Sequence, residues 1–300
     1  MFPISNGMKK LILLDTHALI HRFFHALPPL TTVRGEPVNA VYGVANVVLK
    51  ILREQKPDYL AACFDRPEKT FRSEAFKEYK IHRMAAVPEL IAQFKITREL
   101  LDKFKIKIIE MAGYEADDLI GSLVEKFNPS TSSGQGDLKI IIISGDLDLL
   151  QLVDGEKVVV QFLRRGMSDT FIYNEKTVFD RYNLKPKQLP DLKGLLGDAS
   201  DNIPGVKGFG PKTATPLIQK YNTLENLLDN LWEIPDKIGN KLEAQKDIAL
   251  FSKNLATIKL DVPLAIENLE DLKVSPLDVK ALGEYFKYLG FASLVNRLPN

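Results

Sequence analysis

Three short apolar runs in this chain each end on an aspartate, and this arrangement constrains the fold more than any other feature. The runs LILLD, YLAACFD and KIIIISGDLD bring Asp15, Asp65 and the pair Asp146 and Asp148. Nearly unbroken apolar runs of this length predict strands buried on both faces of a parallel sheet. Because the carboxyl ends of parallel strands meet at one edge of a sheet, we expect these carboxylates to converge there.

A fourth acidic stretch, GYEADD, adds Glu115, Asp117 and Asp118 to the same set. Carboxylates gathered in one place raise one another's pKa values until some take up protons, unless cations neutralise them. The sequence therefore predicts a site for divalent metal ions at this edge of the sheet.

Composition sets only broad limits. With 300 residues, of which 45% are hydrophobic, the chain is long enough for one large and one smaller domain, or for two. The single cysteine, Cys63, lies in an apolar run, so we expect a reducing compartment and a buried thiol. The apolar run before Asp15 is too short for a signal peptide or a membrane span, so we expect a cytoplasmic protein that does not bind membranes. The net charge of +1 by itself gives no evidence for a polyanionic partner.

Strand-like and helical segments alternate in the first half of the chain. This βαβ rhythm predicts an α/β core at 1–185, with a wound parallel sheet. Beyond about residue 185 apolar residues recur at helical spacing, so we expect a helical subdomain at 186–300. The polar loop at 128–137 has no assigned function. The expected strands are 10–14, 59–64, 106–110, 138–143 and 157–163, and the expected helices are 39–54, 88–104 and 116–127.

The stretch GDASDNIPGVKGFGPKTA, at 197–214, is the most specific motif. Its glycines permit a tight turn, and Pro211 suits the start of a helix, so free N–H groups should point outward and grip a phosphate. An ordinary glycine-rich connection is the alternative, but two upstream aspartates, Asp198 and Asp201, tie the stretch to the acidic cluster. Pro216 should lie in the first turn of the following helix, where proline is tolerated. The phosphate-gripping residues are Gly205, Lys207, Gly208, Gly210, Lys212 and Thr213.

The segment at 66–83 is basic on one side. If it is helical, five residues fall on one face at steps of three and four; these are Lys69, Arg72, Phe76, Lys80 and Arg83. A solvated amphipathic helix is the alternative reading, since three glutamates share the segment. Another pattern, His17, His21 and His25, imitates a zinc site, but no further ligand is adjacent.

In their order along the chain, these motifs resemble the 5′ nuclease family, which comprises the N-terminal domain of bacterial DNA polymerase I and related flap endonucleases. The match runs over nearly the full length. It includes D15-T-H, R34-G-E-P-V-N-A-V-Y-G43, F64-D65, F71-R72, Y79-K80 with Arg83, G113-Y-E-A-D-D118, S144-G-D-L-D-L-L-Q-L152 and the stretch 197–214. Leu147 departs from the pattern, because the family usually has Lys or Arg between the two aspartates.

The resemblance implies a PIN-like core with two Mg²⁺ ions, for which Mn²⁺ could substitute, and a helix-hairpin-helix at 197–220 that often binds K⁺. The implied ligands are Asp15, Asp65, Glu115 and Asp117 for the first ion and Asp146, Asp148 and Asp201 for the second, with Asp118 and Asp198 as bacterial additions. It also implies a helical arch near 66–88. There Lys80 and Arg83 would neutralise the scissile phosphate, while Arg72 and Tyr79 guide the strand and Arg22 contacts DNA.

The implied function is a structure-specific 5′-3′ exonuclease and 5′ flap endonuclease that acts in replication and repair. Its expected substrate is DNA with a 5′ flap, nick, gap or free 5′ end, and we expect a monomer with a DNA polymerase as a candidate partner. Three alternatives stay open. The chain could be the nuclease domain of a DNA polymerase I, a DNA-binding module with a disabled site, or a PIN-like ribonuclease, which the hairpin disfavours.

Overall fold

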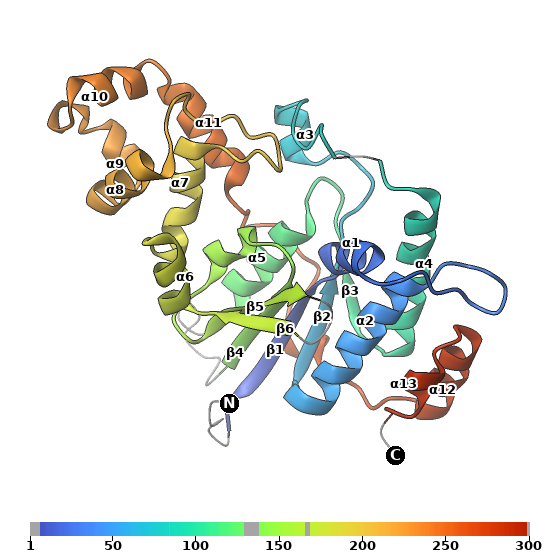
Figure 1. The fold of residues 1–300 in the computed structure, drawn as a ribbon. Helices are drawn as coiled ribbons and strands as arrows, with labels where there is room; N and C mark the ends of the chain where they lie inside the picture. Colours follow the sequence, from blue (N-terminus) through green and yellow to red (C-terminus); the bar gives the residue numbers. More distant parts are fainter. Residues whose placement is uncertain (1–6, 84, 129–137, 166–168, 299–300) are drawn as a thin grey trace.

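A six-stranded sheet forms the centre of the molecule (Figure 1). The structure is a computed structural model that describes residues 7–83, 85–128, 138–165 and 169–298. The strand order is β3-β2-β1-β4-β5-β6, and all neighbours are parallel except β5 and β6. The strands are β1 (Lys9–Asp15), β2 (Tyr59–Cys63), β3 (Lys107–Ile109), β4 (Leu138–Ser144), β5 (Val158–Arg165) and β6 (Asp169–Tyr173).

Strand β1 lies between β2 and β4 and explains why the apolar runs are unbroken. Its successive side chains point to opposite faces of the sheet, and both faces are covered. Ile12 and Leu14 belong to the apolar core on one face, whereas Leu11 and Leu13 belong to the core on the other. All four are fully buried.

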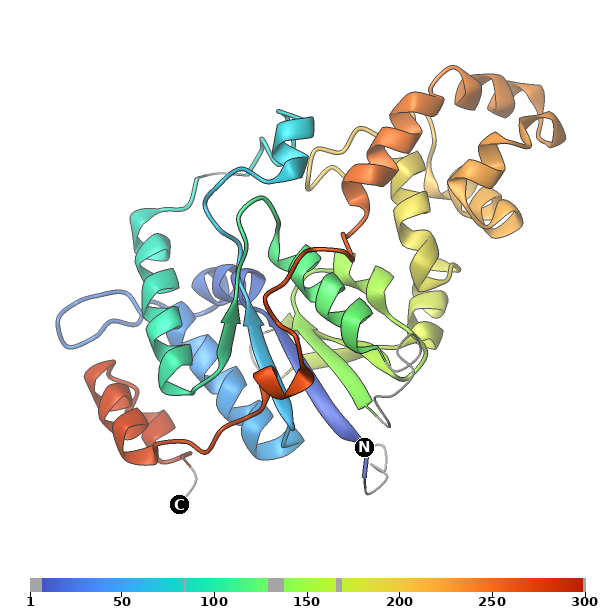
Figure 2. The same cartoon turned by 180° about the vertical axis from the view of Figure 1, so that it is seen from behind.

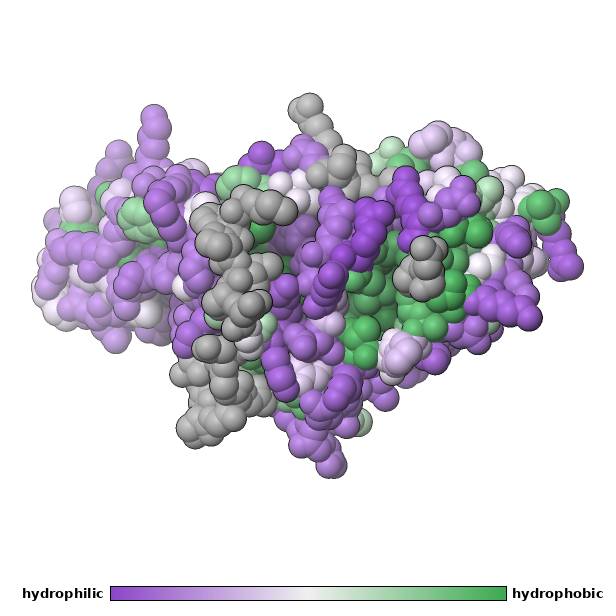
Figure 3. All heavy atoms as spheres, turned by 90° about the horizontal axis from the view of Figure 1, so that it is seen from below, coloured by the Kyte–Doolittle hydropathy of each residue, from purple (hydrophilic) through white to green (hydrophobic). Residues whose placement is uncertain are grey.

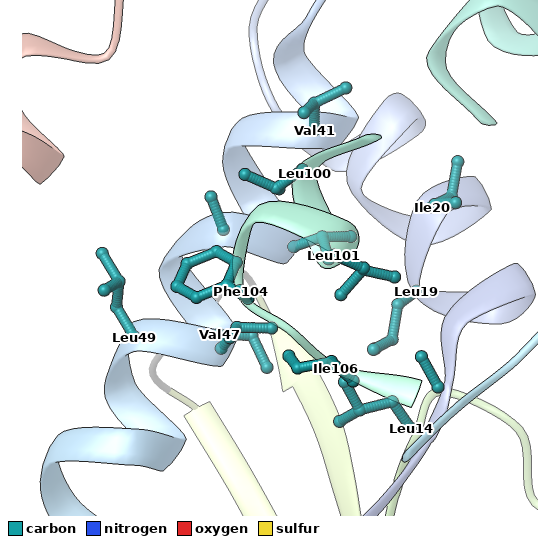
Figure 4. Close-up of a cluster of buried hydrophobic side chains, with 14 of the residues drawn as sticks. Leu14, Leu19, Ile20, Val41, Val47, Leu49, Leu100, Leu101, Phe104 and Ile106 are labelled. Carbon is teal, nitrogen blue, oxygen red and sulfur yellow. The ribbon is translucent and has the colours of Figure 1, made fainter. Parts of the chain in front are cut away.

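Helices cover both faces of the sheet. On one face lie α1 (Thr16–Ala26), α2 (Asn39–Lys50) and α4 (Pro88–Lys103), whose apolar side chains interlock as Figure 4 shows. On the other face lies α5 (Ala116–Phe127), which is seen best from behind in Figure 2. A short π-helical turn, Ile51–Gln55, continues α2.

A separate helical unit lies beside the sheet and has its own apolar core. Its helices are α7 (Leu189–Leu196), α8 (Pro211–Tyr221), α9 (Leu224–Leu228), α10 (Asp236–Glu243) and α11 (Lys246–Ala256), with short 3-10 turns at Pro186–Gln188 and Leu231–Glu233. Helix α6 (Glu175–Tyr182) and the 3-10 turn Asp148–Leu152 pack on the core of the sheet instead, through Val178, Leu149 and Leu150.

The end of the chain returns to the sheet instead of staying with the helical unit. Ile258 and Leu272 join the core beneath α5, and Phe286 and Phe291 join the core beside α2 and α4. The returning elements are the 3-10 turn Leu269–Leu272, α12 (Val279–Tyr288) and α13 (Ala292–Val295). The expectation of one helical subdomain over 186–300 was therefore wrong for its last part, because these apolar side chains complete the core of the sheet.

The expected α/β class, the five expected strands and the three expected helices are confirmed. Three details were wrong. The segment 66–83 contains only the short helix α3 (Phe71–Ala75), since the chain turns extended at Phe76. Pro216 lies inside α8, beyond its first turn, and so removes one helical hydrogen bond. The strand β6 was not expected. The loop at 128–137 lies, apart from Asn128, outside the described residues.

The surface is mixed in character. Seen from below, apolar side chains gather over one part of the surface and hydrophilic residues cover most of the rest (Figure 3). In the described part of the chain, every helix is too short or too polar to cross a membrane.

Candidate active site

Two adjoining cavities open at the carboxyl ends of the central strands. The first, of about 480 Å³, is lined by Asp15, Asp65, Glu115, Asp117 and Asp146. The second, of about 460 Å³, is lined by Asp146, Asp148 and Asp198. Since Asp146 lines both cavities, the structure brings these seven carboxylates to two adjoining cavities.

Asp15 and Asp146 are held by one serine. The Ser144 hydroxyl donates to Oδ2 of Asp15, and the Ser144 Oγ in turn accepts the backbone N–H of Asp146 at 2.8 Å. Asp15 also caps α1, because its Oδ1 accepts the N–H of Ala18 at 3.2 Å. Sequence reasoning missed Ser144, although a hydroxyl at the end of a buried apolar strand needs a hydrogen-bond partner and could have pointed to it.

The N-terminus of α5 places the next carboxylates. Oδ1 of Asp65 accepts the N–H of Ala116 at 2.6 Å, which joins the end of β2 to the first turn of α5. Glu115 caps the same helix, and Asp118 completes the capping box by accepting the N–H of Glu115 at 3.1 Å. Asp117 faces the first cavity from this turn.

Burial and mutual repulsion raise the pKa values of several of these carboxyls. Burial, with a smaller effect of Asp146, raises the pKa of Asp15 to about 7. The pKa of Asp117 lies well above its ordinary value, first through burial and then through the charge of Asp15. Burial and Asp146 raise the pKa of Asp148 to about 6. A bound cation would lower all three pKa values, so the site favours positive charge.

Basic side chains already meet the acidic cluster. Lys80 Nζ lies 2.6 Å from Oε1 of Glu115, and Arg83 Nη2 lies 2.5 Å from Oδ1 of Asp201. The Tyr79 hydroxyl lies 3.1 Å from Oε2 of Glu115 and 3.3 Å from Oδ2 of Asp201. The backbone of Lys80 is left-handed, with φ of 56°, and its N–H donates to the carbonyl of Asp201. This uncommon conformation of a non-glycine residue fits a functional position.

Lys193 was not singled out from the sequence. Its Nζ contacts Oδ1 of Asp148 and lies 2.5 Å from Oδ2 of Asp198, which brings these two carboxylates together. Burial tends to raise the pKa of Asp198, but Lys193 outweighs burial and lowers it. A lysine five positions before a predicted ligand was a signal that could have found it.

Arg72 and Asp118 do not lie where the resemblance implied. Arg72 is only 3% exposed, and Asp118 is fully buried. The guanidinium forms a two-pronged ion pair with the carboxylate, at 2.7 Å and 2.8 Å. Neither residue lines the cavities, so the expectations that Arg72 guides DNA and that Asp118 binds metal are corrected for this structure.

All three histidines of the series line the first cavity. The rings of His17 and His21 pack against each other and against Phe94. The centroids of each pair of rings lie 4.6 Å to 5.7 Å apart. Burial lowers the pKa of His21 to about 4, so its imidazole is neutral. Arg22 lines the same cavity, and its guanidinium donates to the carbonyl of Arg164.

The glycine-rich hairpin is held from within. Gly205 has φ of 63°, and a Cβ there would lie 2.2 Å from the backbone nitrogen of Gly197. Its N–H donates to the Ser252 hydroxyl, and the N–H of Lys207 donates to Oε1 of Gln245. Two of the N–H groups expected to face outward therefore serve the fold, because the hairpin needs them to pack on α11. Gly208 also has a left-handed backbone, and Gly210 precedes the first turn of α8, which holds Lys212 and Thr213.

The carboxylates fit hard divalent cations by their chemistry. Oxygen donors alone suit Mg²⁺ or Mn²⁺, and a bound cation would offset the burial that raises the pKa values of Asp15, Asp117 and Asp148. As the side chains are placed, no three His, Cys, Asp or Glu residues within the described ranges stand close enough to chelate one ion. Lys80, Arg83 and Lys193 occupy carboxylate oxygens instead, so binding would require these ion pairs to rearrange.

Comparisons with known proteins agree with this geometry. The chain is 44% identical over 291 residues to DNA polymerase I of Caldicellulosiruptor bescii and 41% identical to that of Bacillus subtilis; these matches cover 96% and 97% of the chain. The chain spans about a third of the length of these relatives, with 33% and 32% covered.

Two solved structures share the fold. A bacteriophage T5 flap endonuclease in complex with DNA and metal ions has a TM-score of 0.64 at 19% identity, and 96% of each chain is covered. The catalytic core of Rad2 with a DNA substrate has a TM-score of 0.61 at 17% identity, with 97% of this chain and 93% of that one covered.

Two family models match adjoining parts of the chain. Residues 10–183 match the N-terminal resolvase-like domain of the 5′-3′ exonucleases, and residues 184–280 match their C-terminal SAM fold. The border between the two matches falls just before the helical unit, and the first match contains Asp15, Asp65, Glu115, Asp117 and Asp146. The chain therefore belongs to the 5′-3′ exonuclease family of nucleases.

Proposed function

We propose that the chain cleaves DNA as a structure-specific 5′-3′ exonuclease and 5′ flap endonuclease, by hydrolysis of a phosphodiester with two divalent ions. The observation that carries the proposal is the pair of adjoining cavities joined at Asp146, with carboxylates lining both. Asp15, Asp65, Glu115, Asp117 and Asp146 would hold one ion, and Asp146, Asp148, Asp198 and Asp201 the other. Bound there, two ions would activate a water and stabilise the leaving oxygen.

The chain's own residues would prepare the site for a phosphate. Lys80 and Arg83 border the first cavity and now neutralise Glu115 and Asp201. With Glu115 and Asp201 engaged as cation ligands, both side chains would be free to turn to the scissile phosphate and offset its developing charge. Ser144 would keep Asp15 and Asp146 in place while this exchange occurs.

The helical unit would hold the duplex by its backbone. Lys207 and Lys212 are exposed beside the hairpin, and Gly210 is the N-cap of α8. Contacts of this kind grip phosphates without reading bases, so specificity would depend on DNA shape and a free 5′ end. A K⁺ ion at this hairpin and a monomeric state both remain predictions.

We also propose that the chain acts together with a DNA polymerase, in replication and repair. The support is its similarity to two proteins named DNA polymerase I.

Cleavage of a labelled 5′-flapped duplex tests the proposal. Mg²⁺ should permit release of the flap, and EDTA should prevent it. If the duplex is bound but never cut, the chain is a DNA-binding module.

A further inference from the structure

We propose that Arg72 is a positioning residue, which fixes the metal-ligand turn of α5 at a set distance from the DNA-binding hairpin. This inference rests on the proposed function and deepens it. The turn in question carries Glu115 and Asp117. Arg72 reaches it from α3, next to the segment where the chain passes from the helical unit back to the sheet.

The guanidinium uses all five of its N–H donors, which is the most that an arginine can offer. Three go to carboxylates, namely two to Asp118 and one to Oε2 of Glu115 at 3.0 Å. The other two go to backbone carbonyls, from Nε to Leu255 and from Nη2 to Thr257, both at 2.8 Å. With every donor taken and 3% exposure, this side chain has no donor left for DNA.

Asp118 completes the junction from the opposite side. Oδ1 accepts from Arg72 and from the N–H of Lys259 at 2.9 Å. Oδ2 accepts from Arg72 and from the N–H of Glu115. The pair therefore joins α3, the start of α5 and the segment 255–259, in a buried place where charge-assisted hydrogen bonds are strong.

A continuous path connects this junction to the hairpin. The hairpin turn at Gly205 donates to Ser252 of α11, and α11 packs along α7. Helix α11 ends at Ala256, which lies between Leu255 and Thr257, the two residues whose carbonyls accept hydrogen bonds from Arg72. Loosening Arg72 would let the helical unit shift relative to Glu115 and Asp117. A small misplacement of reacting groups of this kind costs about 10²-fold in rate.

The test compares Arg72→Gln, Asp118→Asn and the double variant with the wild type. Single-turnover cleavage of a 5′-flapped duplex in Mg²⁺ is measured beside DNA affinity in EDTA at two salt concentrations, and Mn²⁺ affinity is measured by calorimetry. Arg53→Gln is the matched control, because Arg53 pairs with Glu54 on an exposed surface.

We expect each single variant to cleave at least about tenfold more slowly, with weaker Mn²⁺ binding and an unchanged DNA affinity and salt slope. The double variant should be no slower than the slower single variant, since both residues act through one contact. Two results together overturn the inference. Arg72→Gln would weaken DNA binding and reduce the slope of log affinity against log salt concentration by about one, while Asp118→Asn would leave cleavage and DNA binding unchanged.

Folding could fail in a single variant, because it leaves an unpaired charge buried. Circular dichroism and a melting curve check this, and Arg72→Met with Asp118→Leu removes both charges together. This apolar pair should fold and bind DNA but cleave slowly; full cleavage would overturn the inference. If the wild type itself does not cleave, the proposed function fails, whereas Mn²⁺ affinity still decides the role of Arg72.

Discussion

Lys80 Nζ lies 2.6 Å from Oε1 of Glu115, although Lys80 comes from the segment 66–83 and Glu115 is the N-cap of α5. The contact places a positive charge beside the carboxylates and couples two functional groups that the sequence separates by 35 positions. Burial tends to lower the pKa of Lys80, but Glu115 and Asp201 outweigh it and raise that pKa. The lysine therefore stays charged at neutral pH.

Lys80→Met should slow cleavage about 10²-fold, because a charge that faces the phosphate in the transition state is lost. The single-turnover rate in saturating DNA measures this step. Lys77→Met is the control, since Lys77 is exposed in the same segment and lines neither cavity. Equal cleavage rates for both variants would show that Lys80 only neutralises the charge of Glu115 and does not act on the phosphate.

Asp201→Ala should reduce cleavage at least about 10²-fold while DNA affinity in EDTA changes little. Asp201 is 6% exposed and contacts Arg83, so its loss also frees a cation toward the DNA. Asp180→Ala, at an exposed position in α6, should behave as the wild type does. Loss of binding and cleavage together in Asp201→Ala would mean that this residue supports the fold.

Gly205→Ala should destabilise the hairpin by at least about 1–2 kcal/mol, since its left-handed backbone disfavours a side chain and the Cβ would clash with Gly197. DNA affinity should fall as well. Gly210→Ala is the matched control for stability within the same motif, because a Cβ there meets no atom within 4 Å. Chemical denaturation and fluorescence anisotropy measure the two effects; equal stability of both variants would contradict the packing described.

Mg²⁺ should stabilise the protein more at pH 8 than at pH 5.5. The folded pKa of Asp15, about 7, lies above the ordinary value of 3.8. Between these values the folded state holds more protons than the unfolded state, so stability in EDTA falls as pH rises through this window. Bound Mg²⁺ should offset this loss of stability, because it neutralises the ionised carboxylate. Melting temperatures with Mg²⁺ and with EDTA at both pH values measure it, and an Mg²⁺ effect that does not depend on pH would contradict it.

The strands and the acidic edge of the sheet could be predicted from the sequence, because they depend on local patterns of residues. Apolar runs identified five strands, and the aspartates at their ends identified one edge of the sheet. The burial of Arg72 could not be predicted this way, because it depends on carbonyls 183 and 185 positions away. The same holds for the return of Phe286 to the core. Basic residues at helical spacing in 66–83 suggested a continuous helix, but tertiary contacts of Tyr79 and Lys80 with Glu115 and Asp201 override that periodicity.

The most direct test of the account is Mg²⁺-dependent cleavage of a 5′-flapped, fluorescently labelled duplex by the wild type and by Asp146→Ala. Asp146 is the carboxylate that lines both cavities. The account predicts that the wild type releases the flap in Mg²⁺ but not in EDTA, and that Asp146→Ala binds the duplex without cutting it. Cleavage by Asp146→Ala at the wild-type rate, or by the wild type in EDTA, would contradict the account.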